Sequence, residues 1–390
     1  MARSAHAYVR GSTERYYEWL ASPVGRGLPK GPDVWICGDC HVGNLGPIGH
    51  PEGKAVVELR DLDQTVVGNP VHDLVRLALS LAMAARSSDL PGVTTAHVTE
   101  DLVAGYERAF EGEVADEHIA NLPEPIRIVM KRAVRRTWSS LFDERLGRDN
   151  RRIRIGRRFW PLADEERASL EALVARESTR RLVAKLASRA DDATIRCVDA
   201  AFWVKGCSSL GLWRAAVLVE ITDRTKKGRD RRSLSLLDVK QAVDALAPWS
   251  IPIPERMSPG ERVLEGARRL APALGERMTV ATVADRSVFV RELLPQDLKV
   301  ELDHVSAEQA RSIAHYLGLV VGRAHARQLD ADARRSWHAE MASHRTTDLD
   351  APSWLWRAVI DLVAVHERAY LEHCRRYALD ASRAATKLGD

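Results

Sequence analysis

The sequence has little cysteine and no long apolar run, and both features limit the classes of protein that it can encode. Five cysteines are spread over 390 residues, an odd number that argues against a disulfide framework and fits a reducing compartment. The longest apolar stretch, "LALSLAMAA" from Leu77, is far shorter than the roughly 20 residues of a membrane-spanning helix. The segment up to Leu20 contains no apolar core of a secretory signal. We therefore predict a cytoplasmic protein without a membrane span.

Charge of one sign is not in large excess either, since the net charge is +4. Arginine and aromatic residues are nevertheless concentrated in residues 131–160. This segment is either a solvated helix face followed by a loop or a patch that recruits an anionic ligand. No motif for specific nucleic-acid binding accompanies it.

The pattern of apolar residues predicts an α+β fold. Spacings of three and four predict helices through most of residues 70–190 and in two long segments toward the C-terminus. Strand-like runs such as "RAAVLVEITD" and "SVFVREL" occur between them. We expect a helical lobe over residues 1–190 that carries the catalytic and metal-binding loops, and a β-rich nucleotide-binding lobe over residues 191–300. Helices over residues 301–390 would complete the helical lobe.

The stretch "CGDCHVGN" matches two incompatible motifs. Cys37, Cys40 and His41 have the C-x-x-C-H spacing that attaches a c-type haem. Covalent haem of this type is normally installed outside the cytoplasm, so the absence of an export signal argues against it. A zinc site is also disfavoured, because the other cysteines of the chain make no second close pair. The alternative is the G-D-x-H-x-x-N pattern of a phosphotransferase catalytic loop, which starts at Gly38.

Phosphoryl transfer needs magnesium held against the phosphates of ATP and a base aimed at the acceptor hydroxyl. Asp39 and Asn44 have the D-x-x-x-x-N spacing of a catalytic loop, and "RDLD" provides Asp61 and Asp63 after the next predicted strand. Carboxylate and amide oxygens are the ligands that magnesium prefers. Taken singly, each of these residues is typical of an ordinary turn. Because they occur together in this order, we expect Asp39 to be the base, Asn44 and Asp61 to hold magnesium, and Asp63 to assist.

Two further polar residues near these motifs are expected to support the loop rather than to react. Asp73 lies at the start of the apolar helix "PVHDLVRLALS", where a carboxylate can accept hydrogen bonds from backbone amides. His41 is expected to orient the catalytic loop.

The nucleotide-binding residues are expected in the β-rich segment. "KGCSSLG" lies between two predicted strands, and its glycines allow backbone amides to approach phosphates, although a plain hairpin turn has a similar composition. Lys240, on the next strand, is at the position where a kinase lysine binds the α- and β-phosphates. Glu265, or Glu261 one turn earlier, is the expected ion-pair partner of this lysine. The full predicted set is Gly206, Ser208, Ser209, Gly211, Lys240 and Glu265.

The order of these motifs differs from that of an ordinary kinase, in which the glycine loop and the lysine precede the catalytic loop. Circular permutation accounts for the difference, because an active site between two lobes depends only on the spatial arrangement. "YLGLVVGRAHARQL", from Tyr316, looks like the helix that precedes the catalytic loop in aminoglycoside-phosphotransferase-like kinases. We therefore expect Lys240 to point into the cleft lined by Asp39, and this helix to pack beside the segment that leads into Gly38.

From about Val34 to Leu329 the chain resembles the bacterial domain-of-unknown-function family numbered 2252, whose members are regarded as kinase-like. The motifs that carry the resemblance are "GDCHVGNLG", "RDLDQTVVGNPVHDLVRLALS", "VKGCSSLGLWRAAVLVE", "LLDVKQA", "VFVRELLPQDLK" and "GRAHAR", in this order. The resemblance implies a circularly permuted, bilobal protein-kinase-like fold that binds ATP and Mg²⁺ and phosphorylates a hydroxyl acceptor. Adenylyl transfer from a reversed nucleotide is an alternative, and a non-catalytic nucleotide-binding protein is another. The segment around Val290 to Glu292 would be the linker between lobes that contacts adenine.

Overall fold

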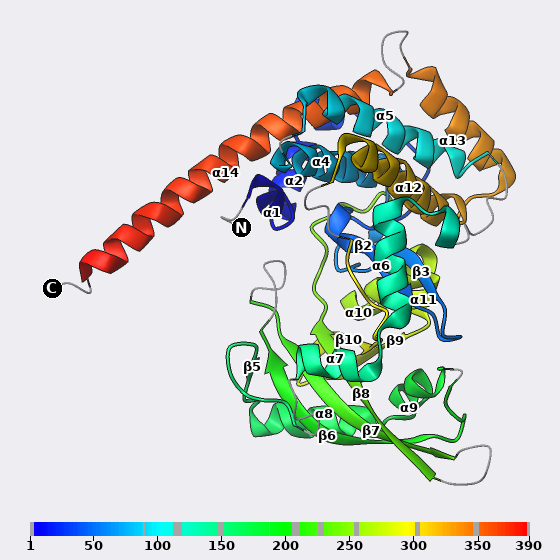
Figure 1. Cartoon of the computed structure of the whole chain (residues 1–390), viewed down its shortest axis with the longest axis vertical. Helices are drawn as coiled ribbons and strands as arrows, with labels where there is room; N and C mark the ends of the chain where they lie inside the picture. Colours follow the sequence, from blue (N-terminus) through cyan, green and yellow to red (C-terminus); the bar gives the residue numbers. More distant parts are fainter. Residues whose placement is uncertain are drawn as a thin grey trace.

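The chain folds into a mixed α+β structure, as the apolar pattern predicts. The computed structural model describes residues 4–88, 90–111, 119–146, 152–186, 188–204, 211–224, 230–252, 257–300, 305–345 and 351–387. A six-stranded sheet with its covering helices lies at one end of the molecule, and most of the remaining helices gather at the other end (Figure 1). Within the described ranges, no helix is both long enough and apolar enough to cross a membrane.

The helices fall into two groups. Those at the helical end are α1 (Ala5–Val9), α2 (Thr13–Leu20), α3 (Pro23–Arg26), α4 (Pro70–Ser87), α5 (Gly92–Arg108), α6 (Glu124–Arg135), α12 (Ala307–Ala326), α13 (Ala331–Ser343) and α14 (Ser353–Lys387). Those nearer the sheet are α7 (Trp138–Arg145), α8 (Asp164–Ala175), α9 (Glu177–Ala184), α10 (Pro259–Leu270) and α11 (Pro272–Gly275). Two short 3₁₀ turns are η1 (Val42–Asn44) and η2 (Ile119–Asn121).

The large sheet is antiparallel throughout. Its strands, in spatial order, are β5 (Phe159–Trp160), β6 (Thr194–Trp203), β7 (Arg214–Arg224), β8 (Asp230–Gln241), β10 (Arg286–Leu293) and β9 (Met278–Val283). Two small antiparallel pairs lie closer to the helices, and they consist of β1 (Val34–Ile36) with β4 (Val66–Gly68), and β2 (Leu45–Gly49) with β3 (Ala55–Leu59).

Helices α4, α5 and α12 form the core of the helical end. Almost every residue of α4 from Pro70 to Ala85 is buried. Helices α5 and α12 approach closely because glycines face the contact: a Cβ atom on Gly105 would lie 1.8 Å from the carbonyl oxygen of His315, and one on Gly318 would lie 2.1 Å from that of Leu102. This packing fixes α4 and α12 beside β1, where the loop predicted to be catalytic begins.

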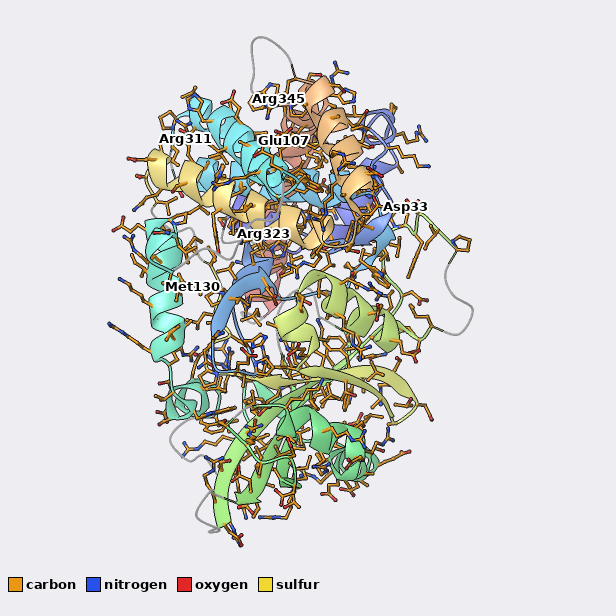
Figure 2. All side chains as sticks on the ribbon, turned by 90° about the vertical axis from the view of Figure 1, so that its right-hand side faces the viewer. Asp33, Glu107, Met130, Arg311, Arg323 and Arg345 are labelled. Atoms are coloured by element: carbon orange, nitrogen blue, oxygen red, sulfur yellow. The ribbon has the colours of Figure 1, made fainter. Side chains whose placement is uncertain are left out.

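Helix α6 connects the helical end to the sheet along one side of the molecule (Figure 2). Met130, labelled on this helix, is buried in the core of the helical end. The chain then continues into α7, which packs against the sheet. The chain therefore passes from the helical end to the sheet along α6.

Both faces of the sheet are covered by helices. Successive residues of a strand point to opposite faces, so each face has its own apolar cluster. On one face, Val217, Val219 and Leu237 pack against Leu170 and Leu173 of α8. The residues that join this cluster from α9 and the end of α8 are Val174, Leu182 and Val183.

The opposite face of the sheet packs against α7. Leu218, Leu236 and Leu293 share a cluster with Leu141 and Phe142 of that helix. Helices α7, α8 and α9 therefore pack against the sheet, although they precede residue 190, and the division of the chain into lobes stays a prediction. The apolar spacing of these segments predicts helices, but it does not identify the surface that they cover.

Candidate active site

The loop that the sequence predicts to be catalytic lies between β1 and η1 and is held by a buried carboxylate. Asp73, near the start of α4, accepts hydrogen bonds from the backbone amides of Cys37 (2.6 Å) and Gly38 (2.9 Å). Nε2 of His325, near the end of α12, lies 3.2 Å from the same carboxylate. The side chains of Asp73 and His325 are each only 1% exposed. The predicted bonding of Asp73 to loop amides and the predicted packing of α12 beside Gly38 are both confirmed.

Asp39 is fixed by three neighbours. Its Oδ1 atom accepts a hydrogen bond from Nε of Arg76 (2.9 Å), and its Oδ2 atom accepts one from the hydroxyl of Thr13 (2.9 Å). Nδ2 of Asn44 donates to the backbone carbonyl of Asp39 (2.9 Å), which sets the spacing between the two ends of the loop. Nε2 of His41 lies 3.9 Å from Oδ2 of Asp39, and burial lowers the pKa of His41 to about 4. His41 is therefore a neutral neighbour at pH 7.

Gly38 lets the loop approach the acidic turn. Its φ angle is +75°, a region that residues with a Cβ atom rarely adopt. A Cβ atom at this position would lie 2.1 Å from the backbone carbonyl oxygen of Gln64. The loop and the turn at Asp61 to Gln64 can lie side by side only because this residue has no side chain.

We expect Gly38→Ala to destabilise the fold much more than Gly53→Ala. Gly53 also has a positive φ angle, +85°, but its Cβ position has no atom within 4 Å, so its substitution should cost about 1 kcal/mol from the backbone conformation alone. At Gly38 the clash with backbone adds to that, for a total of roughly 3 kcal/mol or more. Urea unfolding of both variants measures the difference, and equal losses would contradict the close approach.

Lys240 of β8 reaches the acidic turn although 177 residues separate it from Asp63. Its Nζ atom forms an ion pair with Oδ2 of Asp63 and lies 3.6 Å from Oδ1 of Asp61. Lys240 is almost completely buried, at 3% exposed. Burial works against its charge, but Asp61 and Asp63 outweigh that effect and raise the pKa of Lys240.

The two carboxylates of the turn titrate differently. Desolvation opposes the ionisation of Asp61, but Lys240, Arg291 and Arg214 outweigh it and hold the pKa of Asp61 well below its usual range. Desolvation and the charge of Asp61 raise the pKa of Asp63 to about 6. Asp61 is therefore the carboxylate that stays fully ionised near neutral pH.

Asp61 joins the two halves of the site. It lines a cavity of about 200 Å³ together with Asp39 and Asn44, and it also lines a void of about 20 Å³ together with Lys240. The other residues of the larger cavity are Gly11, Thr13, Glu14, His41, Asp63, Gln64 and Leu246. Lys240 therefore meets the acidic turn that borders the cavity of Asp39, but it lines the smaller void and not that cavity.

The side chains of this cavity could hold a magnesium ion only if a bound nucleotide supplied some of the oxygen ligands of the metal. In the part of the chain that the structure describes, no cluster of three or more His, Cys, Asp or Glu side chains could hold a metal ion by itself. Magnesium is commonly bound by one or two carboxylates plus phosphates and water, and Asn44 and Asp61 match that smaller demand. Oδ1 of Asp63 is buried without a hydrogen-bond partner, which leaves one more oxygen for this role.

The expected glutamate partner of Lys240 is not the one that the structure places there. Glu265 forms ion pairs with Arg269 (2.8 Å) and Arg268 (3.8 Å) on its own helix, and Glu261 caps that helix by accepting from the amide of Ser258. Each glutamate has a partner about one turn away on its own helix, namely arginine side chains for Glu265 and a backbone amide for Glu261. These local contacts form in place of a contact with Lys240. The carboxylates that neutralise Lys240 come from the acidic turn instead.

Part of the predicted glycine loop lies outside the described residues, namely Gly206, Ser208 and Ser209. Gly211 is described, and its φ angle of +88° is that of a tight turn before β7. The segment Val290 to Glu292 is not a linker, because it lies inside β10 and pairs with β8, and Val290 and Arg291 also pair with β9. Its backbone groups are already used by the sheet.

A charged network on the sheet, next to Lys240, was missed by the sequence analysis. Arg214 binds both carboxylate oxygens of Asp238, and Nε of Arg291 donates to Oδ2 of Asp238 at 2.9 Å. Asp238 and Lys240 are two residues apart on one strand, so a period of two places both on the same face. Arg76 was also missed, although an arginine within the apolar run of α4 is an unusual signal.

The structure bears on the alternatives for the cysteines and for the arginine-rich segment. Cys37 and Cys40 are fully buried in the core of the helical end, so they have no surface for a haem. In segment 131–160, Arg136 and Arg145 each form an ion pair with Glu144. One carboxylate thus pairs with two guanidinium groups and leaves a net positive charge, and the choice between a solvated face and a patch for an anionic ligand stays a prediction.

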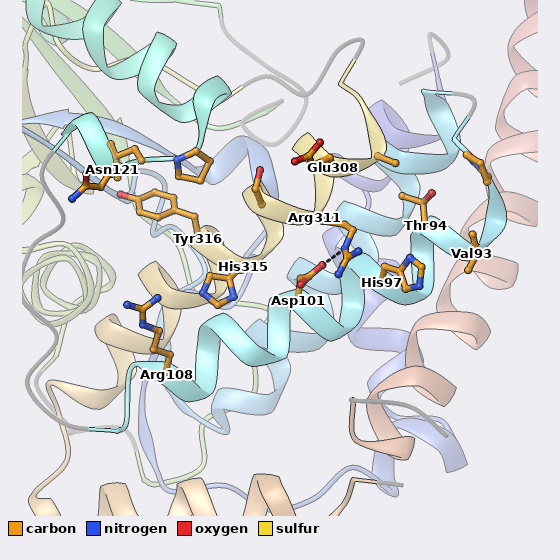
Figure 3. A pocket seen from close by; sticks show the side chains of 15 residues that line it. Val93, Thr94, His97, Asp101, Arg108, Asn121, Glu308, Arg311, His315 and Tyr316 are labelled. Carbon is orange, nitrogen blue, oxygen red and sulfur yellow. Dashed lines mark hydrogen bonds and ion pairs between the residues drawn. The ribbon is translucent and has the colours of Figure 1, made fainter. Parts of the chain in front are cut away.

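Two larger cavities, of about 790 Å³ each, share no lining residue with this site. One lies between α5 and α12, where Asp101 and Arg311 form an ion pair of 2.6 Å and His315 and Tyr316 project from α12 (Figure 3). Asp101 and Arg311 thus neutralise each other, and Glu308 and Arg108 also line this cavity. The chemistry expected from the sequence is concentrated at Asp39, Asp61 and Lys240.

Comparison with known proteins assigns the chain to a family. The family described as uncharacterized protein conserved in bacteria, domain-of-unknown-function family 2252, matches residues 1–376. The protein belongs to this family. No curated protein and no solved structure matches the chain.

Proposed function

We propose that this protein is an ATP- and Mg²⁺-dependent phosphotransferase with a circularly permuted, bilobal, kinase-like fold. The observation that carries the proposal is the meeting of Lys240 with Asp61 beside Asp39 and Asn44. These residues come from segments about 180 positions apart, and no local requirement of the chain brings them together. A lysine, two metal-ligand candidates and a carboxylate base are the parts that phosphoryl transfer needs.

Each residue has a distinct role in this proposal. Lys240 exchanges its contacts with the acidic turn for the phosphates of ATP. Asn44 and Asp61 are the protein ligands of magnesium, with Asp63 assisting, and the ion would neutralise charge on the phosphates. Gly211, which precedes β7, would contact the phosphates, and the other predicted residues of its loop lie outside the described residues.

Asp39 acts on the acceptor. Its carboxylate takes the hydroxyl proton as the acceptor oxygen bonds to the γ-phosphorus and the bond from that phosphorus to the bridging oxygen of ADP breaks. Arg76 and Thr13 hold the carboxylate in one orientation, which keeps its oxygens directed at the same point through the reaction.

Adenylyl transfer is a second candidate that one observation favours. The sheet face beside Lys240 carries Arg214, Asp238 and Arg291, whereas a slot for adenine is expected to be apolar. Arg214 and Arg291 on this face would favour a nucleotide that binds in the reversed orientation, with its terminal phosphates against the sheet. The product separates the two reactions, because phosphoryl transfer releases ADP and adenylyl transfer releases pyrophosphate.

The direct test is incubation of the purified protein with labelled ATP, magnesium and a metabolite extract, followed by mass analysis of the products. A metabolite that gains phosphate, with ADP released, supports the proposal. Pyrophosphate release supports the second candidate. Nucleotide binding without any transferred group would identify a non-catalytic binding protein and contradict both.

Asp61→Asn should lower magnesium-dependent turnover by at least about tenfold, measured at a temperature at which the variant is still folded, because the loss of its charge beside Lys240 also lowers stability. The variant loses a charge from the metal shell but keeps the size of the side chain. Asp33→Asn is the matched control, since Asp33 is an exposed residue just before β1. Near wild-type turnover by Asp61→Asn would contradict the metal assignment.

A further inference from the structure

The second of the two large cavities, of about 790 Å³, lies between α6, α12 and the β2–β3 hairpin. Met130 on α6 and Arg323 on α12, both labelled in Figure 2, belong to its lining. Its volume is within the range of roughly 300–1,000 Å³ that small-molecule sites occupy. Because it shares no lining residue with the cavity of Asp39, a ligand bound here would not occupy the candidate active site.

One part of the cavity wall is apolar and is not fully covered by the protein. Met130 and Val134 lie one turn apart on α6, and both line the cavity. Val134 is 51% exposed. The other branched apolar side chains of the lining are Val56, Val57, Ile119, Leu122, Leu270 and Val320. An apolar group of a ligand would remove this surface from water, which favours binding in proportion to the area covered.

Helix α12 supplies both an apolar and a cationic part of the wall. Four of its residues line the cavity, at spacings of four, three and four, and they are Tyr316, Val320, Arg323 and Arg327. Side chains at these spacings share one face of a helix. The face that carries Gly318 packs against α5 instead. The face that borders the cavity therefore changes from apolar to cationic toward the C-terminal end of the helix.

Cations outnumber carboxylates in the lining of this cavity. The cationic side chains are Lys54, Arg323 and Arg327. Among the described residues of the lining, only Glu58 carries a carboxylate. Lys54 is 77% exposed at the rim and lies 3.5 Å from Glu52 of the same hairpin, so it already has an anionic partner. An anionic group of a ligand would therefore meet its donors at the two arginines of α12.

Glu58 offsets this positive charge only in part. Its two carboxylate oxygens accept from the backbone amides of Ala273 and Leu274, each at 3.4 Å. Burial raises the pKa of Glu58 to about 7, although Arg327, the two amides and Arg277 all act in the opposite direction. The carboxyl group is therefore about half protonated at neutral pH, and the lining keeps a net positive charge.

We propose that this cavity binds a small molecule that has an apolar body and one anionic group, such as a carboxylate. The apolar body lies against Met130, Val134 and Leu270, and the anionic group accepts hydrogen bonds from Arg323 and Arg327. A guanidinium group matches a carboxylate through two parallel N–H donors. This inference does not depend on the proposed function, because the two sites have no residue in common.

Fluorescence titration with 8-anilinonaphthalene-1-sulfonate tests the proposal, since this probe has an aromatic body, an anionic sulfonate and an emission that rises in apolar surroundings. The wild-type protein should show one saturable site, and octanoate should displace the probe. Octan-1-ol has the same chain length without the charge, so it should need an at least about tenfold higher concentration. Displacement by both compounds at the same concentration would contradict an anionic ligand.

Val134→Glu places a charge in the apolar wall and should weaken binding of the probe by at least about tenfold. Ile128→Glu is the matched control, because Ile128 lies on the same helix, is 58% exposed and does not line the cavity. Both substitutions replace an exposed side chain, and the control should bind the probe like wild type. Equal binding by the two variants overturns the proposal.

Arg327→Gln gives a readout that a loss of folding does not imitate. It should bring the inhibition constants of octanoate and octan-1-ol close together, while the constant of octan-1-ol stays near its wild-type value. Arg132→Gln, at an exposed arginine of α6 that does not line the cavity, should keep the difference between the two compounds. The proposal is wrong if Arg327→Gln also keeps this difference, or if the wild-type protein does not bind the probe.

Discussion

Asp39→Asn is expected to reduce group transfer to the acceptor by about a thousandfold, within the 10²–10⁴ range of general-base catalysis, with ATP binding unchanged. Asparagine keeps an oxygen that can accept from Arg76, and its amide nitrogen can donate to the hydroxyl of Thr13, so the loop should keep its shape. What it lacks is the ability to take a proton from the acceptor hydroxyl. Equilibrium ATP binding and the initial rate of transfer, measured on the same preparation, separate the two properties.

The matched control for this variant is Thr13→Val, which removes one hydrogen bond to Asp39 and leaves its carboxylate in place. Its rate should fall by about tenfold or less, in line with the loss of a single hydrogen bond. If Asp39→Asn keeps more than a tenth of the wild-type rate, or falls no further than Thr13→Val, Asp39 is not the base. Loss of ATP binding would instead place Asp39 on the nucleotide side of the site.

Asp73→Ala is expected to lower the free energy of unfolding by about 3 kcal/mol or more. The substitution leaves the amides of Cys37 and Gly38 and the ring of His325 without their acceptor in a fully buried environment. Urea unfolding measures the loss, and hydrogen exchange at the two amides shows whether the catalytic loop opens first.

Asp101→Ala is the control for this second experiment. Asp101 also pairs with a cation of α12, Arg311, but at the exposed surface of the helical end. Solvent screens such pairs, so the unfolding free energy of this variant should stay close to that of the wild type. Equal losses in Asp73→Ala and Asp101→Ala would show that the buried carboxylate does not hold the loop.

Much of the local structure could be predicted from neighbouring residues. The spacing of apolar residues predicts α4, α10 and α12, and the period of two predicts β8 and β10, because these patterns depend only on which side of an element is buried. The position of Asp73 at the head of an apolar helix was enough to predict that it would bind loop amides. The spacing of Asp39 and Asn44 predicts the loop between β1 and η1.

The sequence by itself therefore determined the elements, the catalytic-loop motif and the class of side chain available at the site. Only the tertiary structure decided which carboxylates neutralise Lys240 and which surface α7 to α9 cover. Helix and strand patterns arise from interactions a few residues apart, whereas these contacts join segments that are far apart in the chain. These contacts depend on how whole elements pack against one another. Examples are the close crossing of α5 and α12 and the approach of the acidic turn to Gly38, which has no side chain. No local sequence pattern encodes such packing.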